Sequence, residues 1–88
     1  MVVFDPDKDA ANIVKHGVSL SLAETMDIGA AFIRRDDRKD YGETRFNAYG
    51  HIDGRLYALT FTVRGGDVRA ISLRRARPKE LRQWRTRN

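Results

Sequence analysis

The 88-residue chain contains no cysteine, which excludes disulfide frameworks, thiolate metal sites and cysteine nucleophiles and is typical of a reducing cytoplasm. No apolar run approaches the ~20 residues that a transmembrane helix requires. The N-terminal segment lacks the basic region and the long apolar stretch of a signal peptide. The two histidines, His16 and His51, are far apart, and carboxylates do not recur at ligand spacing. We therefore expect a cytoplasmic protein with no membrane segment, no metal and no other cofactor.

Acidic residues are scarce at one end of the chain. Residues 67–88 carry eight Lys or Arg against Asp67 and Glu80, whereas residues 1–30 carry two bases against five acids. The net charge of +5 is therefore concentrated in the last quarter, where Arg74, Arg75 and Arg77 fall within four positions. Neighbouring guanidiniums repel one another unless an anion lies between them, and phosphate suits their forked donors. This asymmetry predicts a polyanionic ligand, nucleic acid first, or an acidic protein partner.

The length predicts one domain over residues 1–88, and 41% apolar with 33% charged residues indicates a globular chain. Asp5-Pro6 predicts the start of a first helix and Gly17 its end, with an apolar stripe at Ala10, Ile13 and Val14. In its last turn we interpret His16 as a structural cap rather than a catalytic group.

A second helix is predicted to follow Ser19 or Ser21 and to end near residues 27–29. Its expected buried side is Leu20, Leu22, Ala23 and Met26.

Four strands are predicted after the second helix, over residues 30–35, 44–52, 56–63 and 68–75. Asp53-Gly54 indicates a tight hairpin, and residues 64–67 form a second turn. Pro78 is then expected to start a C-terminal helix. The predicted fold class is α+β: two N-terminal helices, a four-stranded antiparallel sheet and a C-terminal helix, with the helices mainly on one side of the sheet.

Strand alternation assigns side chains to the two faces of this sheet. One face carries Phe46, Ala48, Gly50 and Ile52, and the other carries Arg45, Asn47, Tyr49 and His51. In the last strand, alternation places Arg74 with Val68, Ala70 and Ser72, and places Arg75 with Arg69, Ile71 and Leu73. The mixed-sign run over residues 34–40 is interpreted as a solvated, self-neutralising loop.

An open sheet face with imidazole, phenol and guanidinium groups has suitable parts for metal-free RNA cleavage. In that reaction the 2′-hydroxyl attacks the adjacent phosphate, arginines stabilise the developing charge, and an acid and a base move protons. The alternative is a surface that binds nucleic acid without chemistry, and composition alone favours this alternative.

The chain resembles the BrnT toxins over nearly its whole length. The resemblance rests on Phe4-Asp5-Pro6-Asp7-Lys8, Asn12, Lys15-His16-Gly17-Val18-Ser19, Gly42-Glu43-Thr44-Arg45-Phe46, Gly50, Asp53-Gly54, Thr62-Val63-Arg64, Ile71-Ser72-Leu73-Arg74-Arg75-Ala76 and Glu80. It implies a RelE-like ribonuclease fold and a toxin of a type II toxin–antitoxin system that cleaves RNA and inhibits translation. It also implies a BrnA-like antitoxin with a ribbon-helix-helix DNA-binding part, which neutralises the toxin and links it indirectly to operator DNA.

The resemblance also implies site residues. By position, Arg64, Arg74 and Arg75 match the functional arginines, and His51 or Tyr49 is the acid–base candidate. The predicted RNA-binding residues are Arg45, Tyr49, Arg69 and Arg77. Val63 departs from the polar or charged residue that many relatives carry there, so a catalytically inactive protein that binds nucleic acid or its antitoxin is the alternative.

Overall fold

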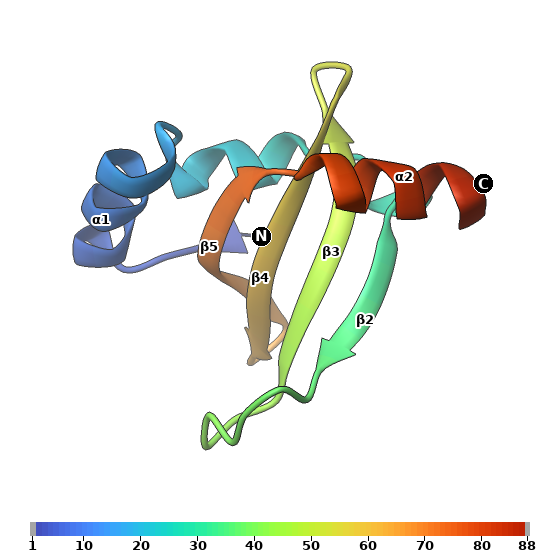
Figure 1. Ribbon diagram of the computed structural model, residues 1–88. Coiled ribbons are helices and arrows are strands. Elements are labelled where there is room, and N and C mark those ends of the chain that lie inside the picture. The colour runs from blue at the N-terminus through green and yellow to red at the C-terminus, as the bar shows by residue number, and fades with distance from the viewer. Residues whose placement is uncertain (1, 88) are drawn as a thin grey trace.

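A five-stranded sheet forms the centre of the computed structural model, which describes residues 2–87 and the side chains of residues 2–85 (Figure 1). The strands are β1 (Val2–Val3), β2 (Phe32–Asp36), β3 (Arg45–Ile52), β4 (Arg55–Arg64) and β5 (Asp67–Arg75). They lie in the order β1-β5-β4-β3-β2, with every pair antiparallel except β1–β5. The α+β class is confirmed. The purely antiparallel four-stranded sheet is wrong, because the two-residue β1 is too short to show any periodicity.

Both predicted hairpins are confirmed. Asp53 and Gly54 have φ angles of 51° and 78°, and Gly65 and Gly66 have φ angles of 56° and 84°. Two successive positive φ values are the geometry that matches the right-handed twist of the flanking strands. These tight turns place β4 in the sheet centre, between β3 and β5.

The first helix, α1 (Pro6–His16), begins and ends as predicted. The Asp5 carboxylate accepts a hydrogen bond of 2.8 Å from the Asp7 amide, and Gly17 ends the helix in the left-handed conformation. The predicted apolar stripe is wrong, because Ile13 is 46% and Val14 is 89% exposed. The helix lies beside β5 (Figure 1), not over a sheet face, so no apolar surface covers these side chains.

Asn12 is the one residue of α1 that is buried. Its amide donates to the carbonyl oxygens of Leu73 (2.8 Å) and Val18 (2.9 Å), and its side-chain oxygen accepts from the Leu73 amide (3.1 Å). The side chain thereby replaces a neighbouring strand along this part of the edge of β5. A polar side chain is therefore what attaches the helix to the sheet.

The predicted second helix consists of two 3₁₀ helices, η1 (Leu20–Thr25) and η2 (Ile28–Ala30), so the expectation of an α-helix is wrong. The predicted buried side is confirmed, because Leu20, Ala23 and Met26 are buried and Leu22 is partly buried against the core. They cover one sheet face, whose core residues are Ala48, Ile52, Tyr57, Leu59, Phe61, Ala70 and Leu73.

The C-terminal helix, α2 (Pro78–Arg87), crosses the sheet on the opposite side from η1 (Figure 1). Its Glu80 contacts Arg74 and Tyr49, which extend from the face away from the core. The expectation that the helices lie mainly on one side is therefore wrong. Among residues 2–87, no helix has the length and apolar character to span a bilayer.

A β-bulge in β5 changes which residues face the core. Thr60 pairs with Ser72 while Phe61 pairs with Ala70, so Ile71 has no partner on β4. The inserted residue shifts the alternation by one position. Leu73 therefore joins Val68 and Ala70 on the core face.

The predicted grouping of the β5 arginines is wrong across this bulge. Arg74 shares the open face with Ser72, as predicted, but also with Arg69, and not with Val68 and Ala70. Arg75 lies on the core side of the strand with Leu73, and not with Arg69.

Gly50 offers a test of the packing between η1 and the sheet. A Cβ atom at this position would lie 2.8 Å from Met26 Cγ and 3.0 Å from Ala31 Cβ. We expect Gly50→Ala to lower the free energy of unfolding by about 1–3 kcal/mol, as overpacking does. Gly29→Ala is the control, because its Cβ would have only an ordinary contact of 3.6 Å. Equal stability of the two variants in urea unfolding would contradict this packing.

Candidate functional site

A polar groove of about 370 Å³ lies on the open face of the sheet, bordered by α1 and α2. Its floor consists of Asn47, Ala58, Thr60 and Ser72 on three adjacent strands. These side chains are short, whereas the arginines and tyrosines around them are long, so the strands leave an open depression. Thr60 donates a 2.9 Å hydrogen bond to the Asn47 side-chain oxygen, which fixes the floor across β3 and β4.

Positive charge dominates the rim of this groove. Six basic side chains line it against only two carboxylates, Asp36 and Glu80. The basic residues are Lys15, Arg34, Arg38, Arg45, Arg74 and Arg77. Cations gathered over a concave surface attract an anion and raise its local concentration.

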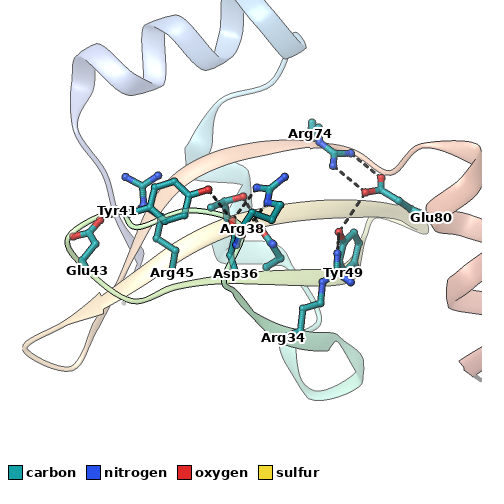
Figure 2. A network of polar contacts seen from close by, with 11 residues as sticks. Arg34, Asp36, Arg38, Tyr41, Glu43, Arg45, Tyr49, Arg74 and Glu80 are labelled. Atoms are coloured by element: carbon teal, nitrogen blue, oxygen red, sulfur yellow. Dashed lines mark hydrogen bonds and ion pairs between the residues drawn. The ribbon is translucent and has the colours of Figure 1, made fainter.

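Arg74 and Glu80 form a two-pronged ion pair at one end of the groove (Figure 2). The two guanidinium NH₂ groups donate to the two Glu80 oxygens over 2.8 and 2.9 Å. Glu80 also accepts from the Arg77 amide (2.7 Å) and from the Tyr49 hydroxyl (3.3 Å). The hydrogen bonds from Arg74 lower the pKa of Glu80 to about 2, and the same pair raises the pKa of Arg74.

Asp36 organises the other end of the groove (Figure 2). Its carboxylate is 1% exposed, accepts from Arg38 over 2.8 Å at both oxygens, and accepts from the Tyr41 hydroxyl over 3.3 Å. The Arg38 hydrogen bonds keep the pKa of Asp36 far below its usual value and raise that of Arg38. The Arg45 guanidinium lies 4.1 Å from the centre of the Tyr41 ring, a stacking distance.

Four of the predicted site residues meet in this groove: Arg45, Tyr49, Arg74 and Arg77. The shared face of Arg45 and Tyr49 confirms the alternation predicted for β3. The catalytic and binding roles assigned to these residues stay predictions.

The other predicted site residues lie outside the groove. Arg64 pairs with Glu43 over 2.6 Å and lies four residues along β4 from Thr60 of the groove floor, which is about 13 Å in a strand. Glu43 also pairs with Arg45 of the rim, so Arg64 adjoins the groove without lining it. Arg75 extends from the core side of β5, and Arg69 lies beyond the bulge, opposite Thr62. His51 packs edge-on against Trp84 of α2, with 5.5 Å between the ring centres.

Several groove residues were not predicted from the sequence. Arg34, Asp36 and Arg38 belong to the run over residues 34–40 that we interpreted as a solvated loop, and Tyr41 follows it directly. Within that run, Arg34 and Asp36 alternate on one strand opposite Asn47 and Arg45. This alternation is the sequence pattern that indicates that both side chains lie on the open face.

His16 also lines the groove. Its interpretation as a cap is not supported by a hydrogen bond, because its ring has none to any described residue. Among residues 2–87, no group of three or more His, Asp or Glu is arranged to bind a metal ion.

The chain matches the family model described as "Ribonuclease toxin, BrnT, of type II toxin-antitoxin system" over residues 4–80. A search of the curated proteins gives no significant match. The matched residues include the four strands β2 to β5 and continue to Glu80 in α2, and only the short β1 strand lies outside the match. The resemblance to BrnT toxins inferred from the sequence is confirmed.

The Arg74–Glu80 pair predicts a pH-dependent contribution to stability. Because the pKa of Glu80 is depressed in the folded state, its contribution is present above the unfolded-state pKa and is lost as the pH falls towards 2. We expect Glu80→Gln to lower the free energy of unfolding at pH 7 by about 1–3 kcal/mol, as expected for charged hydrogen bonds. The difference from the wild type should shrink between about pH 4.5 and pH 2.

The measurement is urea unfolding of both proteins across this pH range. Asp27→Asn is the control, because this exposed carboxylate forms no capping hydrogen bond. A Glu80→Gln deficit that is independent of pH would contradict the ion pair as its source.

Proposed function

Because this chain belongs to the BrnT family of type II toxin–antitoxin ribonuclease toxins, we propose that its groove binds and cleaves single-stranded RNA without a metal ion. The observation that carries the proposal is the excess of six basic side chains over two carboxylates on an open sheet face. Both carboxylates are already paired with arginines, so neither repels a phosphate as an isolated charge would. The proposed activity is endonucleolytic transesterification in the cytoplasm, with inhibited translation as its consequence.

Arg74 is the proposed clamp for the scissile phosphate. Its forked donors already bind the two oxygens of Glu80, which have nearly the geometry of two phosphate oxygens. Arg38, Arg45 and Arg77 would then contact the flanking phosphates. The partly buried rings of Tyr41 and Tyr49 line the groove and provide surfaces for unpaired bases.

The sequence-based prediction named Arg64, Arg74 and Arg75 as functional arginines, whereas the groove favours Arg74 alone as the clamp. Arg64 and Arg75 do not line the groove, so the role proposed for them is contact with RNA beyond the groove rather than the phosphate clamp. Val63 lies near the same remote end of β4 as Arg64 and is 51% exposed. The unusual residue is therefore beside Arg64 and not beside Arg74, and a catalytically inactive protein is the alternative outcome of the cleavage test below.

The partner proposed from the family is a BrnA-like antitoxin with a ribbon-helix-helix DNA-binding part, which would connect the toxin to operator DNA. The chain supplies complementary chemistry, because an acidic segment can occupy the same cationic groove. We expect the product of the adjacent small gene to co-purify with this protein and to suppress RNA cleavage. Co-purification without suppression would contradict neutralisation at the groove.

The test of the activity is incubation of a long single-stranded RNA with the purified protein in excess EDTA, with and without ribosomes. We expect fragments with 2′,3′-cyclic phosphate and 5′-hydroxyl ends. Arg74→Ala should reduce the rate about 10²–10³-fold, as the loss of a transition-state charge contact does. Arg74→Lys should recover part of the rate, because it keeps the charge but loses the fork.

Arg55→Ala is the matched control, since Arg55 is exposed in the hairpin and does not line the groove. Thermal unfolding of each variant establishes that it is folded. Absence of cleavage in every context, or full activity of the Arg74→Ala variant, would overturn the proposal. Arg64→Ala and Arg75→Ala in the same assay decide whether those arginines contribute.

A further inference from the structure

His16 is the only imidazole that lines the groove among the described residues. It is the last residue of α1 and is partly buried. It borders the groove together with Arg74 and Arg77, and it also borders an adjoining pocket with Lys8, Ile71 and Ser72. The bulge turns both Ser72 and Arg74 to the open face of the sheet, and His16 borders the groove on that face.

The two carboxylates that line the groove, Asp36 and Glu80, already form ion pairs with arginines. The hydrogen bonds from Arg38 and Arg74 keep the pKa of Asp36 and Glu80 very low, so both carboxylates are weak bases. His51 is outside the groove and contacts Trp84. The His16 ring nitrogens, by contrast, form no hydrogen bond with the described residues and remain open to a ligand.

The charges around His16 favour a neutral ring. Lys15 lies beside it on α1, Arg74 faces it from β5, and Arg77 faces it from the connection to α2. Burial first, and then these three cations, lower the pKa of His16 below 6.5. The other charged groups that line these two pockets are Lys8, Arg34, Arg45 and the paired Asp36, Arg38 and Glu80. At neutral pH the imidazole is therefore free to accept a proton.

We propose that His16 is the general base of the cleavage reaction, which rests on the proposed function. The neutral imidazole takes the proton of the RNA 2′-hydroxyl, and the 2′-oxygen forms a bond to phosphorus. The bond between phosphorus and the 5′-oxygen breaks, and the 5′-oxygen takes a proton from water. The products are a 2′,3′-cyclic phosphate and a 5′-hydroxyl, and the imidazolium returns its proton to solvent.

The first test is the pH dependence of kcat/KM for RNA cleavage. The wild type should show a rate that rises with pH below about 6.5 and then levels, because only the neutral ring accepts a proton. His16→Gln should lose this rise and about 10²–10⁴-fold in rate at pH 7. Its Kd for an oligonucleotide with a 2′-deoxy residue at the cleavage site should stay within about threefold, because the phosphate contacts are unchanged.

Three outcomes of this test would overturn the inference alone, while leaving the proposed function intact. They are a wild-type profile without the rise, a His16→Gln variant with wild-type kcat/KM, and a His51→Gln variant that loses the rise when His16→Gln does not. His16→Asn and thermal unfolding separate a catalytic loss from a folding defect. Failure of the wild type to cleave RNA in any context would overturn the proposed function, and this inference with it.

The second test assigns the direction of proton transfer. An RNA with a sulfur in place of the bridging 5′-oxygen has a leaving group that needs no proton. If His16 is the base, His16→Gln should be equally slow on this substrate relative to the wild type. Recovery of the rate on the sulfur-containing RNA would show that His16 is instead the acid.

Discussion

The unpaired Ile71 in β5 determines what each face of this small sheet can do. Without the bulge, the alternation from Val68 would bring Ser72 and Arg74 to the core face and leave Leu73 on the open side. With it, Leu73 is fully buried and Arg74 enters the groove. Asn12 stabilises this arrangement, because it hydrogen-bonds the amide and the carbonyl of Leu73 just after the irregularity. One inserted residue thus buries Leu73 in the core and places Arg74 on the proposed active surface.

The second constraint is the mutual repulsion of clustered guanidiniums. Three acids pair with these guanidiniums and separate them: Asp36 with Arg38, Glu80 with Arg74, and Glu43 with both Arg45 and Arg64. The Asp36 carboxylate is almost inaccessible to solvent, so its bonds to Arg38 are less screened than those of a surface pair. Positive charge is consequently placed at fixed positions before any ligand arrives, which reduces the ordering cost of binding.

Sequence predicted the features that depend on local physics. The Asp5 cap, the Gly17 terminus and the Asp53-Gly54 turn each need only a few neighbouring residues, and all three are confirmed. The bulge could not be predicted, because Val68 to Arg75 reads equally well with or without an inserted residue. The exposed Val14 could not be predicted either, since periodicity indicates an apolar stripe but not what covers it.

In the site, too, the features set by neighbouring residues were predictable from the sequence, and those set by tertiary contacts were not. Arg45 and Tyr49 share a face because strand alternation is local, whereas the position of His51 depends on how α2 places Trp84 over it. His16 and Arg74 come from opposite ends of the chain, and only the packing of α1 beside β5 brings them to one groove. Residue types alone therefore indicated a polyanionic ligand, while the choice among the arginines and histidines needed the tertiary structure.

The carboxylate of Glu80 has a consequence for which anions the protein can select. It acts as an internal competitor, because a phosphate reaches the fork of Arg74 only by displacing an oxyanion attached to the same chain. A single phosphate or a mononucleotide offers too few contacts to compensate for that exchange. A polynucleotide makes several contacts along the groove at once, and multivalency then outweighs the tethered acid. In the proposed function, this competition would favour long RNA over the abundant small phosphates of a cell.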